Sequence, residues 1–492
     1  MCYVLLVAAV LLFVIYLIKQ TRKPSNFPPG PTWLPVVGNL PELRKLSQQL
    51  GGQHLALVEL SKKYKTNVLS LKLGSSHFVT VFSYPLVKSV LQSDEYDGRP
   101  DNFFIRLRTM GTRKGVTCTD GELWKIQRSF VVTHLRNLGF GKKTMELLIK
   151  EEVSEVINLL GKNGTSVQIG KVLAPAVINI LWALTSGSRI NRNDARLNRL
   201  LELLSLRTKV FDMSGGLLSQ YPWLRFFMPE KTGYNVIMKL NSDLKYLLME
   251  TIKQHLQEWS EGASDDLIYS FITEMKKANG HETTFTEEQL VMVCLDIFIA
   301  GSQTTSNTLD FAFMMMILHP DIQNKVHTCL DQAFDGSKEF SYSDRTKIPY
   351  IEAVLLEIER FCHVTPVTGP RRVLRDTTLE GYYIPQGTIV LVSSYSVHND
   401  KDYWGDPEVF RPERFLDDKG KVLHHDRLIT FGLGRRRCLG EILARQCMFI
   451  FFTEIMRKFE ITVSPGTKKP TGVPLPGITL TPEEYTAKFI GR

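Results

Sequence analysis

The amino-acid sequence predicts a mainly α-helical fold of the α+β class, with one long central helix and small β-sheets at the periphery. Residues 140–280 consist mainly of segments with the apolar periodicity of amphipathic helices. A longer apolar run, residues 287–319, follows the capping-box pattern Thr286-Glu-Glu-Gln289 and stops before Pro320. Because this run is apolar on all sides, we expect a helix buried at the centre of the molecule. Segments that alternate like β-strands are short and lie far apart, at 68–73, 78–82 and 377–398.

The composition is that of an ordinary globular protein and excludes several classes. Of the 492 residues, 43% are hydrophobic and 23% are charged. The formal net charge of +9 favours an anionic partner or a membrane surface. The basic residues are dispersed and no nucleic-acid-binding module occurs, so we expect no nucleic acid partner. Seven cysteines without a Cys-x-x-Cys pair argue against a disulfide framework or a zinc site, and for a reducing compartment.

Residues 1–19 are expected to anchor the chain in a membrane. The segment 2–18 is uncharged and almost wholly apolar, which brings it near the lower length limit of a helix that spans a bilayer. A cleaved signal peptide needs a basic N-terminal region and a small-residue cleavage site, and the segment has neither. The positive charges that follow, Lys19, Arg22 and Lys23, place the body of the protein in the cytosol.

A proline-rich hinge at 20–35 and a single domain at 36–492 follow the anchor. The proline density predicts a stiff, extended spacer. Residues 99–121 are rich in Gly, Thr, Asp and Arg and are expected to form a long loop. The loop at 213–229 combines glycine, proline and aromatic residues. It suits a membrane-contacting surface, a substrate entrance or a packed loop between helices, and these alternatives stay open.

Two pairs of residues are placed on helices so that they share one face. Trp124 and Arg128 are four residues apart, and indole and guanidinium N–H groups are suitable donors to a carboxylate. Taken alone, this pair is more typical of a half-buried tryptophan beside a surface arginine. Glu357 and Arg360 lie on a helix that begins at Pro349, at a spacing that allows an ion pair. Such a pair is usually part of a solvated face.

The middle of the long helix carries small and polar residues, Ala300-Gly-Ser-Gln-Thr-Thr305. Glycine and hydroxyl residues lower helix propensity, so their presence in a buried helix indicates a local requirement. Gly301 would let a planar ligand approach the helix. Close packing of another helix against the small residues is the alternative explanation.

The segment that begins at Phe431 has the features of a site for a sulfur ligand. It reads Phe431-Gly-Leu-Gly-Arg-Arg-Arg-Cys438-Leu-Gly-Glu-Ile-Leu-Ala444 and runs from a tight loop into a helix. Its glycines permit close approaches that a β-carbon would prevent. At the start of a helix, a Cys438 thiolate meets N–H groups and the positive end of the helix dipole. The alternative is a buried structural cysteine beside a solvated arginine cluster.

The pattern Phe-x-x-Gly-x-Arg-x-Cys-x-Gly in this segment resembles the haem-binding loop of the cytochrome P-450 superfamily. Further motifs follow in the family's order: Trp-x-x-x-Arg, Ala-Gly-x-x-Thr-Thr, Glu-x-x-Arg, and Pro412-Glu-Arg414-Phe. The resemblance covers the chain after the anchor and implies the cytochrome P-450 fold, with haem between the long helix and the loop. A thiolate on haem iron favours O–O cleavage, so the implied reaction is monooxygenation of a lipophilic substrate.

The resemblance also implies roles for single residues. Cys438 would be the axial ligand of haem b, and Thr304 would hydrogen-bond dioxygen and relay protons. Gln303 stands where the family usually has an acid, and an amide orders water but does not donate a proton as a carboxylic acid does. Further haem contacts are expected from Trp124, Arg128, Ala300, Gly301, Arg371, Phe431 and Arg436, of which Trp124 and the three arginines would hold the propionates. Arg372 is an alternative to Arg371. A buried structural cluster behind the haem is expected from Glu357, Arg360 and Arg414.

Similarity to microsomal members of the superfamily implies partners and a location. The chain would sit in the endoplasmic reticulum membrane with its catalytic domain facing the cytosol. Electrons would come from NADPH through NADPH-cytochrome P-450 reductase, with cytochrome b5 as an optional second donor. A basic docking face is expected to include Arg435, Arg437, Arg445 and Lys125.

Finer resemblances point to a substrate. Three short sequences are similar to those of insect members of the superfamily: Gly-Arg99-Pro, Trp-Lys-x-x-Arg and Ala-Gly-Ser-Gln-Thr-Thr-Ser. Residues 99–119 and 51–60 resemble enzymes that epoxidise methyl farnesoate in juvenile hormone biosynthesis. The alternatives are a broad-specificity hydroxylase of xenobiotics or other lipids, a haem-thiolate isomerase or dehydratase that needs no reductase, and a haem sensor without catalysis.

Overall fold

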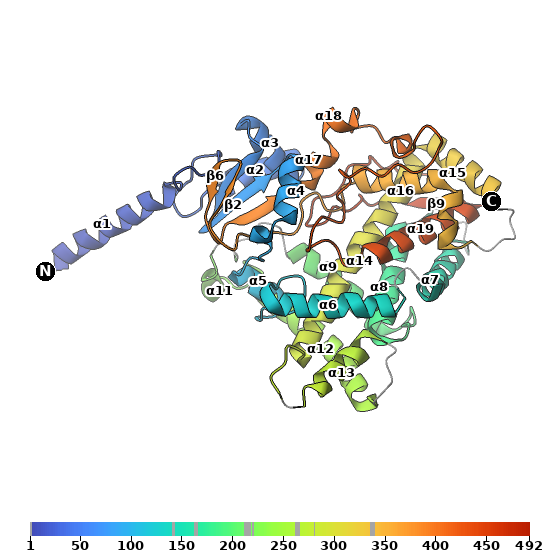
Figure 1. Cartoon of the computed structure of the whole chain (residues 1–492), viewed down its shortest axis with the longest axis horizontal. Coiled ribbons are helices and arrows are strands. Elements are labelled where there is room, and N and C mark those ends of the chain that lie inside the picture. Colours follow the sequence, from blue (N-terminus) through green and yellow to red (C-terminus); the bar gives the residue numbers. More distant parts are fainter. Residues whose placement is uncertain are drawn as a thin grey trace.

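The computed structural model describes residues 2–139, 143–161, 166–210, 218, 221–260, 266–279, 281–334 and 340–492. Over these residues it confirms the prediction of a mainly helical α+β fold with small, separate sheets (Figure 1). Residues 213–217, 219 and 220 of the predicted loop at 213–229 lie outside the described part.

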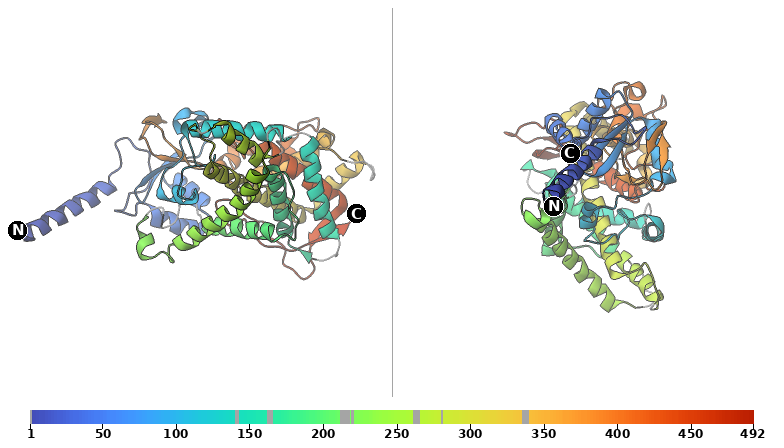
Figure 2. Two further views of the ribbon diagram at one scale, coloured as in Figure 1. Left: turned by 90° about the horizontal axis from the view of Figure 1, so that it is seen from below. Right: turned by 90° about the vertical axis from the view of Figure 1, so that its left-hand side faces the viewer.

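The first helix stands apart from the body of the protein. α1 (Cys2–Thr21) projects from it in two perpendicular views (Figures 1 and 2), and its apolar side chains are exposed. The mean hydropathy of 2.3 over Tyr3–Thr21 is that of a helix able to cross a membrane. α8 (Ile169–Ser186) is also long and apolar enough, but 61% of it is buried in the domain, as expected of a core helix.

The proline-rich segment lies on the domain and does not form a free spacer. Phe27 and Trp33 are buried. Ser70, on strand β1 (Val68–Leu73), donates its N–H to the Pro29 carbonyl at 2.7 Å. The extended backbone that prolines favour therefore aligns this segment with a strand, and the predicted hinge is shorter than its proline content suggests.

A four-stranded sheet in the order β1-β2-β7-β4 builds one side of the domain. β2 and β7 are parallel although they are far apart in the sequence, and the other pairs are antiparallel. Alternating side chains divide the packing between its faces: leucines of β1 pack with α2 and α3, whereas valines of β1 and β2 pack with α4. The bounds of these elements are β2 (Ser76–Val81), β7 (Ile389–Val392), β4 (Arg371–Arg372), α2 (Leu40–Leu50), α3 (Gln53–Lys63) and α4 (Tyr84–Gln92).

α14 (Glu287–Leu318) runs through the middle of the helical body (Figure 1). It packs against α8, α12 (Tyr234–Glu258), α16 (Pro349–Phe361) and α19 (Glu441–Lys458). The Thr286 side chain accepts the Gln289 N–H at 3.2 Å and begins the helix where the capping pattern predicted. The surrounding elements are α5 (Phe103–Arg108), α6 (Gly121–Asn137), α7 (Lys143–Gly161), α9 (Ala195–Val210), α11 (Leu224–Phe227), α13 (Leu267–Lys277), α15 (Pro320–Ala333), α17 (Ser394–His398) and α18 (Lys401–Trp404).

Two small sheets complete the structure. β8 (Phe459–Val463) pairs with β9 (Ala487–Gly491), which also pairs with β3 (Ser166–Val167). β5 (Thr377–Leu379) and β6 (Tyr382–Ile384) form a hairpin.

Helix boundaries differ from expectation at two functionally relevant places. α5 lies within the predicted loop at 99–121, because the Asn102 side chain caps it by accepting the Ile105 N–H at 2.9 Å. The helix after the cysteine loop begins at Glu441, three residues later than Cys438.

Candidate active site

The middle of α14 keeps accessible side chains although the helix is central. Phe298 and Thr305 are buried, whereas Ala300 is exposed and Thr304 is only partly buried. Because five other helices pack on α14, we infer that this accessible surface faces an interior space.

The Cys438 thiol lies deep in the molecule, and yet part of its surface is accessible. The residue is exposed, yet desolvation by burial is the largest influence on its pKa and raises it. Both observations hold when a thiol faces an interior space. The Gly440 N–H and the Arg128 and Arg437 cations act in the opposite direction and favour the thiolate. Burial therefore outweighs the influences that the sequence suggested would favour the anion, and a bound metal ion would reverse the balance.

The backbone of the cysteine loop is folded by two glycines. Gly432 and Gly434 have φ angles of 73° and 70°, in the left-handed region that favours glycine. A β-carbon on Gly434 would lie 2.1 Å from the Leu91 carbonyl oxygen, so no other residue fits there. The Cys438 N–H donates to the Phe431 carbonyl at 2.8 Å and closes the loop.

Four guanidinium groups gather beside this loop, those of Arg99, Arg128, Arg371 and Arg436. Burial lowers the pKa of Arg371 to about 10 and that of Arg436 to about 9, and the Arg99 cation lowers both further. Burial also lowers the pKa of Arg99 and Arg128. Because these cations repel one another, a negatively charged group bound among them would stabilise the cluster.

Protein partners hold these arginines in place. Arg436 lies 3.7 Å from the centre of the Trp124 ring and donates to the Asp97 carbonyl at 2.6 Å. Arg128 lies 5.7 Å from the same ring, which agrees with the predicted shared face. Arg371 donates to the Asp97 carboxylate at 2.9 Å, so it already has a carboxylate partner within the chain. Arg372, the alternative, donates to Asp120 at 2.7 Å.

These residues fit a haem group. In the described part of the chain the buried Nε atoms of Arg99 and Arg436 have no hydrogen-bond partner. Such orphaned donors are costly unless a ligand satisfies them. Haem brings two propionates for the arginines and an iron for the accessible Cys438 thiol. Sequence reasoning singled out Gly-Arg99-Pro only as a resemblance to insect members and missed Arg99 as a site residue, because its proximity to Arg371 and Arg436 depends on contacts between distant segments.

The residues of the segment 300–305 on α14 contact different parts of the molecule. A β-carbon on Gly301 would lie 2.8 Å from Leu181 of α8, so this glycine serves helix packing. This contact supports the packing alternative, and the expected contact of Gly301 with a planar ligand stays a prediction. The Thr304 hydroxyl donates to the Ala300 carbonyl at 2.8 Å and keeps its oxygen as an acceptor. Gln303 accepts from the Thr479 hydroxyl at 3.4 Å, so the residue in place of the usual acid contacts the C-terminal segment.

Glu357, Arg360 and Arg414 form a buried cluster. Arg360 binds the Glu357 carboxylate through two bonds of 2.8 Å, and both side chains are fully buried. Arg414 donates to the same carboxylate at 3.1 Å. Arg360 also donates to the His398 carbonyl at 2.9 Å, and Arg414 to the Trp404 carbonyl at 3.0 Å. The cluster joins α16 to the segments before the cysteine loop and is not the solvated face that the spacing alone suggests.

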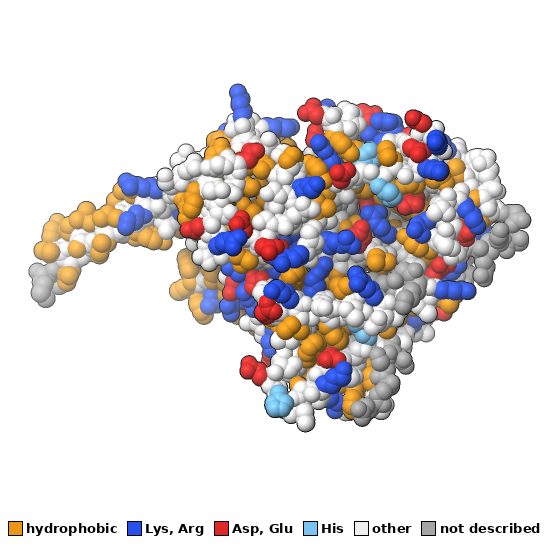
Figure 3. Space-filling model, in the orientation of Figure 1, with side chains coloured by type: hydrophobic (Ala, Val, Ile, Leu, Met, Phe, Trp, Pro, Cys, Tyr) orange, Lys and Arg blue, Asp and Glu red, His pale blue; other side chains and the backbone are white. Residues whose placement is uncertain are grey.

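Most of the cations expected in a docking face are engaged in ion pairs. These pairs are Arg435–Asp97, Arg445–Glu359 and Lys125–Glu122. Arg435 and Arg445 therefore help to hold the fold, because Asp97 and Glu359 are buried. Figure 3 shows acidic and basic side chains mixed across one face of the molecule, without a continuous basic stripe on that face.

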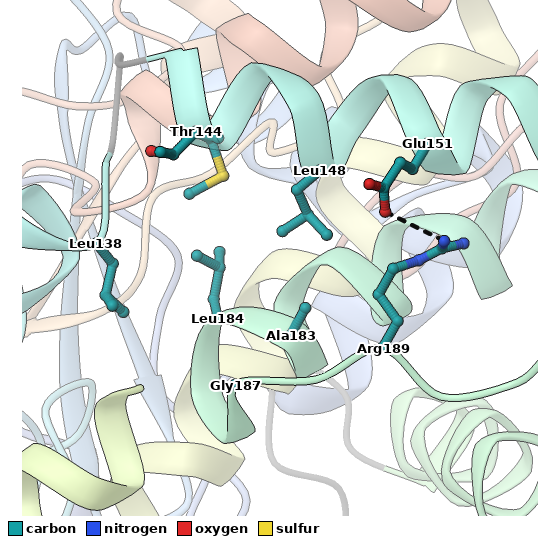
Figure 4. Close-up of a pocket in the computed structure, with 9 residues that line it drawn as sticks. Leu138, Thr144, Leu148, Glu151, Ala183, Leu184, Gly187 and Arg189 are labelled. Atoms are coloured by element: carbon teal, nitrogen blue, oxygen red, sulfur yellow. Dashed lines mark hydrogen bonds and ion pairs between the residues drawn. The ribbon is translucent and has the colours of Figure 1, made fainter. Parts of the chain in front are cut away.

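A separate cavity of about 320 Å³ opens between α7 and α8 (Figure 4). Leu148 and Leu184 give it apolar walls, and an ion pair of 3.2 Å between Arg189 and Glu151 lies along it. None of its lining residues belongs to the candidate haem site.

Comparison with known proteins identifies the family. The family model described as cytochrome P-450 matches residues 28–489. Over 99% of both chains, the protein is 44% identical to probable cytochrome P-450 305a1 of Drosophila melanogaster and 35% identical to farnesoate epoxidase of Bombyx mori. It is also 35% identical to cytochrome P-450 2J1 of Oryctolagus cuniculus, over 99% of this chain and 96% of the relative. The chain therefore belongs to the cytochrome P-450 family of haem-thiolate monooxygenases.

Proposed function

We propose that this monooxygenase epoxidises methyl farnesoate, a reaction of juvenile hormone biosynthesis. The observation that carries the proposal is the 35% identity to the farnesoate epoxidase of Bombyx mori over 99% of both chains. The 44% identical relative from Drosophila melanogaster has a name that specifies no substrate. A broad-specificity hydroxylase is the second candidate, because the chain is also 35% identical to a mammalian cytochrome P-450 whose name specifies no substrate.

In this proposal the cysteine loop and the arginine cluster hold the haem. Cys438 would supply the thiolate ligand, and Trp124, Arg128, Arg371 and Arg436 would hold the propionates together with Arg99. Phe431 and Ala300 would contact the haem group. Bound haem supplies the activation of molecular oxygen. The buried cluster of Glu357, Arg360 and Arg414 fixes the segment behind the loop.

Proton delivery is assigned to α14. The Thr304 oxygen has an acceptor position open while its proton is held by the Ala300 carbonyl. A hydroxyl that both donates and accepts can pass a proton along a hydrogen-bonded chain. Gln303 takes part by ordering water, because its amide does not release a proton at neutral pH.

Electron supply and location follow from the microsomal type of the relatives and from α1. NADPH-cytochrome P-450 reductase is the proposed donor, with cytochrome b5 as a second. α1 anchors the chain in the endoplasmic reticulum membrane. Lys19, Arg22 and Lys23 keep the domain on the cytosolic side.

A reconstituted assay tests the proposal. The full-length chain is combined with reductase, phospholipid and NADPH, and methyl farnesoate, fatty acids and xenobiotics are supplied separately under labelled oxygen. We expect methyl farnesoate to gain one labelled oxygen atom in a reaction that requires NADPH and reductase, with the product read by mass spectrometry. Oxidation of xenobiotics but not of methyl farnesoate would favour the hydroxylase. Conversion without NADPH would favour an isomerase or dehydratase.

A further inference from the structure

Glu359, on α16, is a buried carboxylate that belongs neither to the arginine cluster nor to the Glu357 cluster. Its side chain is 2% exposed, and one of its oxygens accepts from the Arg445 guanidinium at 3.1 Å. Within the described residues, the other oxygen is buried and has no hydrogen-bond partner. Because an unpartnered oxygen in the interior disfavours the charged form of a carboxyl group, Glu359 is suited to accept a proton there.

Arg445, on α19, connects Glu359 to the cysteine loop. Its guanidinium carbon lies 4.8 Å from the centre of the Phe431 ring, and its Nε atom donates to Glu441 at 3.3 Å. The Phe431 carbonyl in turn accepts the Cys438 N–H at 2.8 Å. A change in the charge of Glu359 therefore alters the electrostatic field at this loop, both directly and through the Arg445 cation.

The charges around Glu359 place its titration near neutral pH. Burial raises the pKa of Glu359 to about 7; the Arg445 cation opposes this rise, and the Glu441 and Glu352 carboxylates add to it. Tyr342 also faces this group, and burial raises the pKa of the Tyr342 hydroxyl, so that it stays neutral. Both protonation states of Glu359 are therefore accessible under physiological conditions.

Charged side chains on the other elements packed against α16 have different partners. Lys325 of α15 pairs with Glu413 of the 3₁₀ helix η3 (Pro412–Phe415) at 2.6 Å. Arg414, also on η3, belongs to the buried Glu357 cluster. The carboxyl group of Asp310, on α14, lies against the first turn of α8.

A small cavity gives Glu359 access to solvent. It has a volume of about 30 Å³ and lies between α16, α19 and the 3₁₀ helix η2 (Tyr342–Lys347). Its lining includes Glu359, Arg445 and the partly buried side chains of Arg345 and Glu352. This volume holds about one or two water molecules. A proton can therefore reach Glu359 without crossing the interior space beside α14.

We propose that Glu359 takes up a proton when the haem iron is reduced, and that it thereby couples the reduction potential of this monooxygenase to pH. The electron comes from the electron donor of the monooxygenase reaction and converts ferric to ferrous iron. The proton comes from solvent and forms an O–H bond on the unpartnered oxygen of Glu359, and no other bond changes. An added electron makes the haem site more negative, which raises the proton affinity of a nearby carboxylate. Reciprocally, protonation of Glu359 favours reduction to the same extent.

Glu359 is a positioning residue in this scheme, because it acts on the loop through Arg445. The coupling requires Cys438 to be the haem ligand, as proposed, but it does not depend on the substrate that is oxidised. It would persist if methyl farnesoate were not a substrate, and the carbon monoxide spectrum of Cys438→Ser tests the ligand separately.

Potentiometric titration of the full-length, haem-loaded enzyme tests the coupling without substrate or reductase. The potential of the ferric/ferrous couple is measured with chemical mediators between about pH 6 and about pH 8, on either side of the pKa of Glu359. We expect the potential to fall as the pH rises through this range, because Glu359 binds its proton at least about threefold more tightly in the reduced enzyme. That ratio corresponds to about 28 mV, since a tenfold change is about 59 mV for one electron. Glu359→Gln should remove this part of the fall, because an amide does not titrate.

Two further variants make the test specific. Glu454→Gln is the matched control: Glu454 also lies on α19 and pairs with an arginine, Arg457, at 3.5 Å, but it is about 2.5 turns beyond Arg445. It should keep the pH dependence of the parent. Arg445→Gln removes the cation that holds the pKa of Glu359 down, so the fall should move to higher pH. This second variant tests the coupling even if Glu359→Gln does not accumulate.

Infrared difference spectra between the reduced and oxidised enzyme detect the proton itself. Reduction near neutral pH should add a carboxylic acid C=O band in the parent and in Glu454→Gln, and no such band in Glu359→Gln. Potentials of the parent and Glu359→Gln that fall in parallel with pH would overturn the proposal. A carboxylic acid band that persists in Glu359→Gln would also overturn it, because another group would then take up the proton.

Discussion

A single thiol shows how local influences compete at the residue scale. Cys438 lies near the start of a helix, and Arg128 and Arg437 favour its anion, but burial prevails and raises its pKa. The site is therefore not a reactive thiolate by itself. It becomes a thiolate site only with a metal ion that binds sulfur.

Replacement of this ligand gives the first prediction. Cys438→Ser should abolish the red-shifted carbon monoxide band of the reduced haem protein, because thiolate donation produces that band. Cys447→Ala is the control: this thiol lies on α19 but is buried, so the band should persist. The measurement is the absorption spectrum of each reduced variant in the presence of carbon monoxide. A band kept by Cys438→Ser and lost in the control would show that the ligand is misassigned.

The second prediction concerns the proton path. Thr304→Ala should leave NADPH consumption in place but shift output from oxygenated product to peroxide, because the proposed proton-relaying hydroxyl is lost. The measurement is product formed per NADPH consumed, together with released peroxide. Thr308→Ala is the matched control, since its hydroxyl makes the same bond one turn later, to the Thr304 carbonyl at 2.8 Å. Unchanged coupling in Thr304→Ala would mean that this residue only packs the helix.

Gln303 allows a complementary change. Gln303→Glu restores the acid that the family usually has, and coupling should stay equal or improve. A marked loss of coupling would indicate that the Gln303 contact with Thr479 matters more than proton donation.

Residues fixed by local spacing were predictable, and residues fixed by distant contacts were not. Trp124 and Arg128 share a face because they are four residues apart. Arg371 instead pairs with Asp97, 274 positions away in the sequence, and no local pattern announces that contact. The backbone at the end of α5 is likewise held by Arg207 and Asn241, which lie on other helices.

At the scale of elements, long helices were predicted well because their periodicity is repeated many times. α14 begins at its capping residue and ends before Pro320 as expected. α5 was missed because a helix of six residues carries little periodicity, and the polar residues around it resemble a loop. The packing of the proline-rich segment was not predicted, because it depends on β1 and not on the composition of the segment itself.

Two histidines carry the third prediction: the buried His398 at the end of α17 and the partly buried His363 after α16. The Nε2 atom of His398 accepts the Ile429 N–H at 3.1 Å, and that of His363 accepts from Asn399 at 2.8 Å. Both rings are therefore neutral. Burial and the Arg360 cation lower the pKa of His398 to about 3. Burial, His398 and Arg360 also lower the pKa of His363 well below its usual value.

The sign of the pH effect follows from these values. Above about pH 6.5 the histidines are neutral in both the folded and the unfolded chain, so they contribute no pH dependence. Below it, only the unfolded chain gains the protons. Each histidine then lowers the free energy of unfolding by up to about 1.4 kcal/mol per pH unit as the pH falls toward the folded value.

Thermal unfolding as a function of pH checks this effect. His398→Gln keeps a hydrogen-bond acceptor for Ile429 but cannot be protonated, so its midpoint should fall less steeply than that of the parent between about pH 7 and pH 5. His424→Gln, on the exposed surface, should follow the parent curve. Parallel curves for the parent and His398→Gln would contradict the prediction.

At the scale of the whole molecule, contacts between segments far apart in the sequence decide the architecture. β2 and β7 are parallel neighbours, with Phe78 opposite Ile389. β3 lies beside β9 near the C-terminus. Such registers were beyond prediction from periodicity, because a short strand does not specify its partner. The whole fold was nevertheless predictable through the family resemblance, which rests on motifs that the same architecture brings together.

The two parts of the predicted membrane contact lie in different regions of the chain. α1 exposes its apolar side chains along its length. In the other region, Trp223 and the α11 residues Phe226 and Phe227 are exposed at 56%, 70% and 76%. Exposed aromatic residues of this size favour the membrane-contacting interpretation of the 213–229 loop over a packed loop.

The last prediction separates these two contacts. Deletion of residues 1–19 should weaken binding to phospholipid vesicles and leave the haem spectrum unchanged, because α1 stands apart from the domain (Figure 2). The deletion stops before Gln20, whose carbonyl accepts from Lys72 at 2.6 Å.

Residual vesicle binding of the shortened chain should then fall at least about tenfold in Phe226→Ser/Phe227→Ser, since each ring loses apolar burial in the bilayer. Leu374→Ser is the control, because Leu374 is 38% exposed but belongs to the turn between β4 and β5. It should leave vesicle binding unchanged. Vesicle flotation measures the bound fraction. Loss of haem binding on deletion would show that α1 belongs to the folded core, and unchanged flotation of the double variant would leave α11 as an ordinary surface turn.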